Sequence, residues 1–478
     1  MLIVLVIVIV FVIVQVVLKN RKNVMKFDLF CTKPILKGDK IVNILKTKLT
    51  YDNETSELFH SDGTKFNFKK TKHFANKEVF AVSEQTPGKK SNIKTLKIQL
   101  GLSCNYSCEY CSQRFVPNSE ETNPYYVEKF MNSLDLWILV PPKKIEFWGG
   151  EPLVYWKTLK PLSERLRIKY PEAEFLMITN GSLLNDEIIQ WIQDVDISIG
   201  ISHDGPGQHI RGPDPFDDSK IRDTIFKLIE LRPEKVSINA MIYRDNFSRE
   251  KVQTYFENLL GKRFNFFIGE GGFIDSYDEG GKSMNLHDEE EHYIFRYNSL
   301  NEIREEKINK FNIVRSRLFE WFNSIVNERL ASSLGQKCGM DKEDTIAVDL
   351  RGNVLTCQNV SAVSTAPNGR SHLIGHVSKL ENVNLTTATH WKFRKECSNC
   401  PVLQVCKGSC MFLQDELFEI SCNSAYSDHI PFFSAAIEQM TGWLPYRIEA
   451  QNYELPENRK DLWGQDFKRK KINVENKN

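Results

Sequence analysis

The stretch LGLSCNYSCEYCSQ, residues 100–113, decides how the rest of this chain is interpreted, because it gathers three cysteines in one short segment. Three residues separate Cys104 from Cys108, and two separate Cys108 from Cys111. Three thiolates can hold three irons of a cubane [4Fe–4S] cluster and leave the fourth iron without a protein ligand. The spacing therefore indicates an open iron at which a substrate or cofactor can bind.

Spacing alone leaves two other interpretations of these cysteines open. One is a zinc site, in which a histidine such as His203 or His209 completes a tetrahedral set of ligands. The other is a group of three buried structural thiols that bind no metal. The sequence around the loop favours the cluster over both.

Strands alternate with amphipathic helices from residue 95 onward, which is the pattern of repeated βα units in a parallel sheet or barrel. Six such units predict an α/β fold with a partial, TIM-like barrel. Ligands of such folds bind at the carboxyl ends of the strands, so the loops that follow the strands are where a site is expected. The predicted strands are LKIQL, KKIEFW, EFLMIT, ISIGIS, VSINAMI and FNFFIG.

Three of those loops carry short motifs in addition to the cysteine loop. The glycines of WGGEP let a backbone approach a ligand closely, and the carboxylate of Glu151 can accept a hydrogen bond from an ammonium group. Each motif alone is weak, but four in order at successive strand ends form a consistent set. The candidate residues are Gly149, Gly150, Glu151 and Pro152, then Thr179, Asn180 and Gly181, then Ser202, Asp204, Gly205 and Arg211.

The cysteine loop, with Tyr110 directly before its last cysteine, and these motifs together resemble the radical S-adenosylmethionine (SAM) superfamily over residues 95 to about 325. The resemblance implies that Cys104, Cys108 and Cys111 bind a [4Fe–4S] cluster whose open iron is chelated by the amino and carboxylate groups of SAM. It also implies cleavage of SAM to a 5′-deoxyadenosyl radical that abstracts hydrogen from a substrate. The implied SAM-contacting residues are Tyr110, Gly149, Gly150, Glu151, Pro152, Thr179, Asn180, Ser202, Asp204 and Arg211.

Seven further cysteines lie between residues 338 and 422, a region that we expect to form loops and short turns held together by metal. Taken alone, its CxxC-rich spacing fits one or two zinc ions. The spacing also resembles the SPASM domain, which follows radical SAM cores and carries two auxiliary [4Fe–4S] clusters. The resemblance implies that Cys338, Cys357 and Cys410 bind the first auxiliary cluster and that Cys397, Cys400, Cys406 and Cys422 bind the second. No cysteine lies between residues 111 and 338, so the first cluster takes another fourth ligand or keeps an open iron.

The resemblance implies an enzyme, a radical SAM oxidoreductase or maturase that oxidises or crosslinks a ribosomally made peptide or protein. In sulfatase-maturing members an aspartate follows the second SPASM cysteine. Here Gln358 follows Cys357 and cannot accept a proton at neutral pH, which argues against formylglycine formation by that route. A low-potential electron donor of the flavodoxin or ferredoxin kind is the implied redox partner. Two alternatives stay open, namely the same chemistry on a small metabolite or lipid, and a non-catalytic zinc-binding scaffold.

The first 18 residues, MLIVLVIVIVFVIVQVVL, are apolar except for Gln15. As a helix they would span about 26 Å, slightly less than a bilayer core of about 30 Å. Lys19, Arg21, Lys22 and Lys26 follow this run, and the positive-inside tendency then places the rest of the chain in the cytoplasm. We therefore expect a membrane-anchored protein with a cytoplasmic catalytic part. A wrongly assigned start site and a buried or sticky strand are the alternatives.

The loop GEGGFIDSYDEGG after the sixth predicted strand carries Glu270, Asp275, Asp278 and Glu279. It is either an acidic rim that favours cationic peptide segments or a solvated acidic loop. The whole chain has a net charge of +1, so its charge gives no indication of a nucleic-acid partner. The predicted segments are a transmembrane anchor at 1–23, a small β-rich unit at 24–94, the radical SAM core at 95–330, the SPASM domain at 331–435 and a tail at 436–478.

Overall fold

The computed structural model describes most of the chain after its first 24 residues. The described residues are 25–37, 40–71, 89, 91–114, 116–117, 122–261, 267–275, 277, 279–305, 312–366, 369–385 and 389–465. Within them, no helix combines the length and apolarity needed to cross a bilayer. The predicted anchor at 1–23 lies outside the described residues and stays a prediction.

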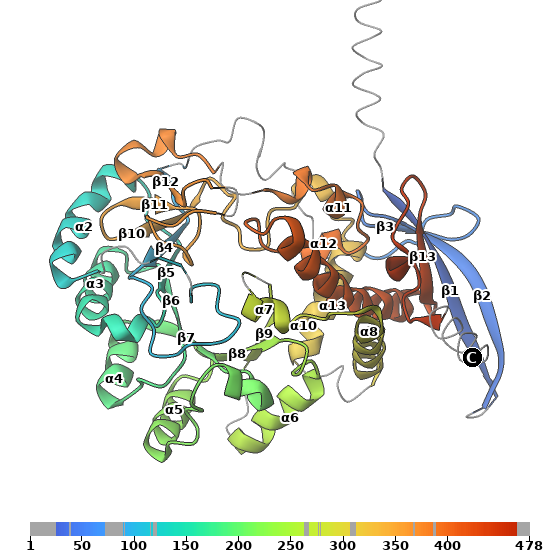
Figure 1. Ribbon diagram of the computed structural model, residues 1–478, viewed down its shortest axis with the longest axis horizontal. Coiled ribbons are helices and arrows are strands. Elements are labelled where there is room, and N and C mark those ends of the chain that lie inside the picture. Colours follow the sequence, from blue (N-terminus) through green and yellow to red (C-terminus); the bar gives the residue numbers. More distant parts are fainter. Residues whose placement is uncertain are drawn as a thin grey trace, which may run out of the picture.

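Six parallel strands follow one another in chain order across the larger sheet as far as one of its edges. They are β4 (Thr95–Gln99), β5 (Lys144–Trp148), β6 (Glu174–Thr179), β7 (Ile197–Ser202), β8 (Val236–Ile242) and β9 (Phe267–Phe273). The helices between them cover the outer side of the curved sheet (Figure 1). These are α2 (Pro124–Trp137), α3 (Trp156–Lys169), α4 (Asp186–Asp194), α5 (Ser219–Leu231) and α6 (Arg249–Leu260). The predicted α/β fold with a parallel sheet is confirmed.

Local sequence explains why these elements form where they do. Strand residues such as Ile98, Phe147 and Ile238 are completely buried, as expected for a sheet whose two faces are both covered. Polar N-caps start the helices that follow: the side chains of Asn185 and Asp218 accept hydrogen bonds from the first turns of α4 and α5. The apolar strands thus form the core. Each N-cap residue fixes where the loop after a strand ends and the next helix begins.

The cysteine-rich region adds three strands to the same sheet, which corrects the expectation that it consists only of loops and short turns. Strand β10 (Thr345–Asp349) pairs in parallel with β4, and β11 (Asn353–Leu355) and β12 (Leu373–His376) continue the sheet antiparallel. This direct pairing fixes the region against the first strand of the barrel. Its short helices are α11 (Lys395–Ser398) and α12 (Leu403–Cys406).

A second sheet has the strand order β13-β1-β2-β3 and joins the two ends of the described chain. Its strands are β1 (Lys26–Lys37), β2 (Lys40–Asp52), β3 (Glu57–Phe59) and β13 (Leu444–Ala450). The predicted β-rich unit at 24–94 therefore takes a strand from the predicted tail, where Trp463 is also buried. The short helix α14 (Glu457–Lys460) follows β13.

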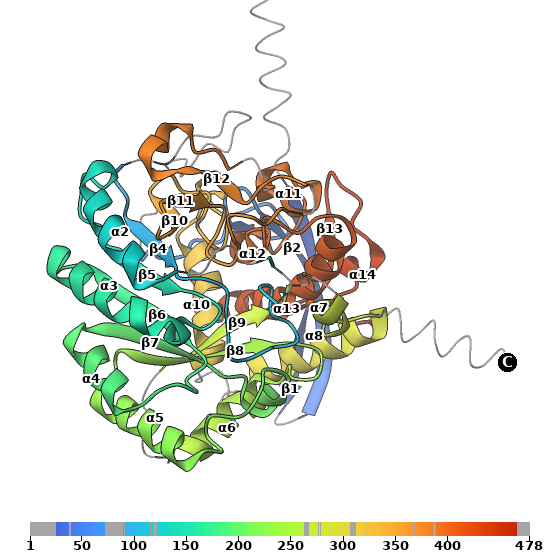
Figure 2. The same cartoon turned by 60° about the vertical axis from the view of Figure 1, so that its left-hand side comes forward.

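The long helix α13 (Asp415–Thr441) runs between the barrel and this second sheet (Figures 1 and 2). Phe433 of α13 packs edge-on against Tyr51 of β2 and Trp321 of α10 (Asn312–Val326), with ring centroids 5.1 and 5.0 Å apart. Helix α8 (Glu289–Arg304) packs along α13, and α7 (Glu279–Ser283) lies before α8 in the chain. One apolar core therefore continues from the barrel into the small sheet.

A buried ion pair holds α13 to the barrel and gives a testable prediction. Asp428 pairs with Arg249 and, at 2.7 Å, with Arg317. Burial alone would raise the pKa of Asp428, but the two guanidinium groups hold it well below its ordinary range. We expect Asp428→Asn to lower the free energy of unfolding by about 3–5 kcal/mol, because it removes a buried negative charge that pairs with two guanidinium groups.

The pH dependence of this contribution follows from the direction of the shift. Since folding lowers the pKa of Asp428, its stabilisation is present above the unfolded value of about 4 and is lost as the pH falls below it. Chemical denaturation at pH 7 and pH 3 measures both effects. Glu438→Gln on the same helix is the control, since its partly exposed pair with Arg304 contributes at most about 1 kcal/mol. Equal losses for the two variants at pH 7 would contradict the prediction.

Candidate active site

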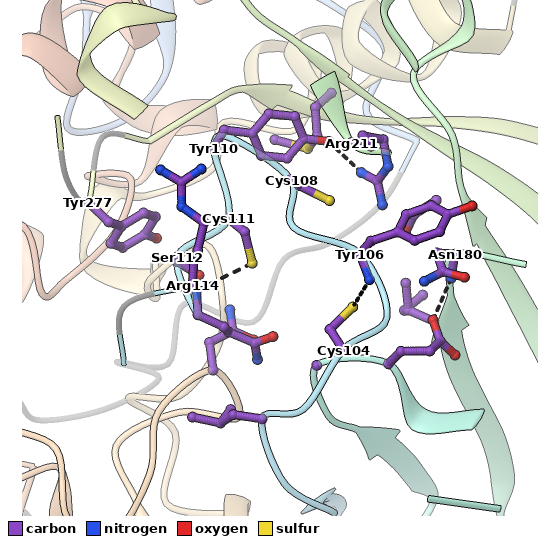
Figure 3. Close-up of a pocket in the computed structure, with 18 of the residues that line it drawn as sticks. Cys104, Tyr106, Cys108, Tyr110, Cys111, Ser112, Arg114, Asn180, Arg211 and Tyr277 are labelled. Carbon is purple, nitrogen blue, oxygen red and sulfur yellow. Dashed lines mark hydrogen bonds between the residues drawn. The ribbon is translucent and has the colours of Figure 1, made fainter. Parts of the chain in front are cut away.

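The three-cysteine loop and the ends of strands β5, β6 and β7 surround one cavity of about 600 Å³. The loop leaves β4 at its carboxyl end, as the other motifs leave their strands. The side chains of Cys104, Cys108 and Cys111 face a common space inside this cavity (Figure 3). The structure therefore brings together the residues that the spacing of motifs along the sequence had suggested.

Close backbone packing holds the cysteine loop against the end of β5. The backbone N–H of Glu151 donates to the Ser103 carbonyl at 3.0 Å, and the Ser103 N–H donates to the Tyr155 hydroxyl at 2.7 Å. A Cβ atom on Gly150 would lie 2.3 Å from the Ser103 carbonyl oxygen and 2.4 Å from that of Leu102. Gly150 is thus required by the neighbouring loop backbone, whereas the sequence analysis had attributed this glycine to approach of a ligand.

A methyl group at this position tests whether the packing matters. We expect Gly150→Ala to displace the cysteine loop and to lower the iron bound per chain after anaerobic reconstitution, because backbone atoms cannot move aside as side chains can. The control is Gly63→Ala, which is strained by a φ of +83° but has no atom within 4 Å of the added group. Normal iron content in Gly150→Ala would show that the loop tolerates the shift.

Glu151 connects the ends of β5 and β6. Its Oε1 accepts hydrogen bonds from the Thr179 hydroxyl at 2.7 Å and the Leu153 N–H at 3.1 Å, and its Oε2 accepts from the Asn180 N–H at 2.7 Å. Burial raises the pKa of this carboxyl group, although the three hydrogen bonds oppose the shift. A carboxylate has about four acceptor sites, so one site on Oε2 remains for a donor in the cavity.

Arg211, Tyr110 and Asp204 form a polar chain on another wall of the cavity. The Tyr110 hydroxyl accepts a hydrogen bond from Arg211 (Figure 3). The same hydroxyl donates to Asp204 at 2.6 Å, and Arg211 lies 3.8 Å from Asp204. Burial alone would lower the pKa of Arg211, but Tyr110, Asp204 and Cys108 raise it above its ordinary value. Within the described residues the buried Nε of Arg211 has no hydrogen-bond partner. A buried cation on the cavity wall suits an anionic ligand such as a carboxylate.

The structure divides the predicted SAM-contacting residues into those that line the cavity and those that do not. Asp204 is completely buried behind Arg211 and Tyr110, so it supports those side chains instead of lining the cavity. Pro152 starts the short helix after β5 and is also absent from the wall. The predicted residues on the wall are Tyr110, Gly149, Gly150, Glu151, Thr179, Asn180, Ser202 and Arg211.

The chemistry of the donor set fits a cluster that binds each thiolate at a different iron. Backbone N–H groups of Tyr106 and Gln113 lie 3.3 and 3.4 Å from the sulfurs of Cys104 and Cys111, and such donors favour a charged sulfur. Among the described residues, no three or more His, Cys, Asp or Glu side chains are gathered tightly enough to hold a single metal ion. A cubane spaces its ligands more widely than one ion does, because each sulfur binds its own iron.

The seven later cysteines separate into the two groups that the resemblance implied. Cys338, Cys357 and Cys410 line a second cavity of about 650 Å³. Cys397, Cys400, Cys406 and Cys422 line a third, smaller cavity. Burial raises the pKa of Cys400 to about 12 and that of Cys406 to about 11, with the neighbouring sulfurs adding to the shift. Thiols so close together and so hard to ionise are suited to a metal cluster, whose positive charge offsets the cost of their deprotonation.

Arginines surround these two groups. Arg394 donates to the backbone carbonyls of Cys410, Met411 and Leu413, which fixes the segment that carries Cys410. Arg459 donates to the Cys422 sulfur at 3.3 Å. Their positive charges would offset the negative charge of thiolates in both cavities.

The first two cavities adjoin, and sequence analysis missed most of the residues between them. Six residues line both: Ser112, Val116, Asp275, Tyr277, Lys337 and Asn359. The Tyr277 hydroxyl hydrogen-bonds the Cys410 thiol, and Asp275 accepts a hydrogen bond from Ser409. Asp275 therefore lies inside the joined chamber, while the side chains of Glu270, Asp278 and Glu279 lie outside the described residues. No motif identifies Lys337, although its neighbour Cys338 was predicted.

Residues 98–253 match the family model described as the radical SAM superfamily. The chain therefore carries a radical SAM domain, as the four strand-end motifs indicated. The match includes the three-cysteine loop and the loops after β5, β6 and β7, which are the segments around the first cavity.

Known proteins with similar sequences modify other molecules by radical SAM chemistry or mature sulfatases, as their names state. The radical SAM cyclopropyl synthase TigE of Paramaledivibacter caminithermalis is 24% identical over 355 residues, which cover 67% of this chain and 68% of that protein. The serine-type anaerobic sulfatase-maturating enzyme of Bacteroides thetaiotaomicron is 23% identical over 341 residues, 65% of this chain and 80% of that protein.

The solved structure of native anSMEcpe with bound AdoMet has the same fold. It superposes with a TM-score of 0.51 at 20% identity, covering 73% of this chain and 98% of that one. At this level of identity the likeness shows the fold and leaves the reaction of this chain to be argued from its own residues.

Proposed function

We propose that this protein is a radical SAM maturase that abstracts hydrogen from a residue of a peptide or protein. The observation that carries the proposal is the cavity in which three thiols, Glu151 and Arg211 face one another at four strand ends. When bound at the three thiolates, a [4Fe–4S] cluster with SAM supplies a 5′-deoxyadenosyl radical. The residues of the chain then bind, orient and shield that cofactor.

The cavity wall offers complementary groups for the polar parts of SAM. The remaining acceptor site of Glu151 suits the amino group, and the positive charge of Arg211 on the same wall suits the carboxylate. Asp204 and Tyr110 keep the Arg211 guanidinium charged and in place, so they act as positioning residues. Ser202 and Asn180 are polar groups on the same wall and are suited to the ribose hydroxyls.

We assign two auxiliary [4Fe–4S] clusters to the later cysteines, with Cys338, Cys357 and Cys410 at the first. The four-cysteine group Cys397, Cys400, Cys406 and Cys422 would then bind the second. Because the first group has three cysteines, a cluster held there would have one iron without a cysteine ligand. A low-potential flavodoxin-like or ferredoxin-like protein is the proposed electron donor.

The substrate class follows from the size of the chamber and from the relatives. Two adjoining cavities of about 600 and 650 Å³ leave room for a side chain or a peptide turn beside the cofactor. The name of the sulfatase-maturating enzyme supports a protein substrate. Gln358 lines the second cavity and accepts a 3.4 Å hydrogen bond from Lys97, so this uncharged side chain cannot serve as the base expected for formylglycine formation.

The apolar run at residues 1–18 and the basic residues behind it support a further part of the proposal, that the chain is anchored in a membrane with its catalytic part in the cytoplasm. Fractionation of cells that express the full chain, with a chain starting at Met25 as the comparison, tests this part separately from the chemistry.

Metal content tests the cluster assignment without any substrate. We expect the anaerobically purified full chain to be brown and to contain iron and sulfide for three clusters. Alanine at each of the three cysteine groups in turn is expected to remove one cluster's share, whereas Cys31→Ala, at a buried cysteine of the small sheet, removes none. SAM is expected to perturb the electron paramagnetic resonance signal of the reduced protein only when Cys104, Cys108 and Cys111 are all present. A colourless protein that binds zinc would overturn the proposal.

A further inference from the structure

The side chains of the β1–β2 hairpin are buried near the body of the protein and exposed at its far end. Near the body, Phe27 and Leu29 of β1 and Leu49 and Tyr51 of β2 are at most 1% exposed. Farther out, every described side chain at 33–36 and 40–46, here called the hairpin tip, is exposed. Six of them are large aliphatic groups, 39–61% exposed: Ile35, Leu36, Ile41, Val42, Ile44 and Leu45. A soluble surface rarely gathers so many apolar side chains without a partner.

The aliphatic groups lie on both faces of the hairpin tip. Register pairs Pro34 with Ile44 and Lys33 with Leu45. Successive strand residues point to opposite faces, so Ile44 and Leu45 are on different sides. A folded protein partner would cover one of these faces and leave the other in water.

The edges of the hairpin tip are also open among the described residues. Strand β13 pairs with β1 only at 27–32, and β3 pairs with β2 only at 50–52. A peptide that added a strand at either edge would satisfy backbone groups but would leave the aliphatic side chains exposed. A lipid environment would cover the aliphatic side chains on both faces of the hairpin tip, whereas either kind of protein partner would leave some of them exposed to water.

The charged residues of the hairpin tip indicate the kind of lipid surface that it would contact. Lys33, Lys40 and Lys46 are exposed and make no ion pair within the described residues, and the sequence from 33 to 46 carries four lysines against one acidic residue, Asp39. Lysines beside aliphatic groups match the boundary between acyl chains and anionic head groups. The apolar run at residues 1–18 precedes β1, whose first residue, Lys26, lies at the other end of the hairpin from the tip, so the two apolar features are separate along the sheet.

We propose that the hairpin tip inserts into the head-group region of a bilayer that contains anionic lipids. This contact is separate from the chemistry of the active site and from the anchor at residues 1–18. It makes the small sheet a membrane-facing surface, with Ile41 and Leu36 reaching the acyl chains and the three lysines at the head groups.

Insertion can be measured on the full chain, even if residues 1–18 already attach it to vesicles. Leu36→Trp and Ile41→Trp each place a reporter on the tip, and Leu231→Trp places a matched reporter on a residue of α5 that is 50% exposed. The vesicles contain phosphatidylcholine and phosphatidylglycerol with brominated acyl chains, which quench tryptophan on contact. We expect a blue shift and extra quenching, relative to the unsubstituted chain, for the two tip variants and not for the α5 variant.

Each other outcome counts against the proposal. No extra quenching at either tip position, with the protein bound to the vesicles, would overturn it. A blue shift without vesicles, together with a dimer in sedimentation that Leu36→Ser with Ile41→Ser disperses, would assign the surface to a second copy of the chain. Quenching that is equally strong on vesicles of phosphatidylcholine alone would overturn the part played by anionic lipid. Unchanged cluster absorbance in all variants confirms that they are folded.

Discussion

Arg211→Met is expected to weaken SAM binding by roughly thirty-fold or more, which corresponds to the loss of about 2–5 kcal/mol for truncating one partner of a buried, hydrogen-bonded charge pair. The reason is that Arg211 places a positive charge on the cavity wall and is held there by Tyr110 and Asp204. Without the guanidinium, the SAM carboxylate loses its cation and Asp204 is left buried without a counter-charge.

Equilibrium binding of labelled SAM to the oxidised, cluster-loaded chain measures this effect without turnover. Arg211→Lys keeps the charge but loses the planar fork, so we expect intermediate binding. The matched control is Arg165→Met on the solvent side of α3, where an exposed pair with Glu128 is lost and SAM binding is unchanged. Normal SAM affinity in Arg211→Met with full iron content would show that the carboxylate binds elsewhere.

The second large effect separates radical formation from product formation. Alanine at Cys338, Cys357 and Cys410 together is expected to abolish modification of the natural peptide substrate while 5′-deoxyadenosine is still released from SAM. These cysteines line the adjoining cavity of about 650 Å³, whereas the SAM cavity is built by other residues. Product loss then reports the role of the first auxiliary cluster alone.

Mass spectrometry of the peptide and chromatography of the nucleoside give the two readouts from one reaction. Cys31→Ala, in the small sheet, should preserve both activities, since that cysteine lies on neither cavity wall. If the triple variant keeps the cluster held by Cys104, Cys108 and Cys111 but releases no 5′-deoxyadenosine, then the first auxiliary cluster is required for SAM cleavage itself, which would contradict the prediction.

The sequence predicted the barrel strands well because they are apolar on both faces and regularly spaced. It failed where pairing across long distances decides the structure. Strand β13 has polar residues among its apolar ones and was predicted to be part of a terminal tail, but it forms a strand because it pairs with β1. Strand β11 has only three residues. Such short or mixed segments have too little periodicity of their own to be assigned.

In the candidate active site, too, the residues within sequence motifs were predicted, whereas contacts between distant segments were not. Motif spacing identified Glu151 and Arg211, whose neighbours in sequence include glycines at strand ends. It placed Asp204 at the ligand, whereas the fold buries that residue behind Arg211, because only the tertiary structure brings Tyr110 and Arg211 beside it. Lys337 reaches the chamber from a position without a motif of its own, and Tyr277 lies in the loop that was singled out for its acidic residues and not for its tyrosine.

The most direct test of the radical SAM assignment is 5′-deoxyadenosine release from SAM by the anaerobic, reduced full chain, compared with the same chain carrying alanine at Cys104, Cys108 and Cys111. The account predicts release by the natural chain and none by the variant. No release from a natural chain that holds all its clusters, with its peptide substrate present, would contradict it, as would equal release by both proteins.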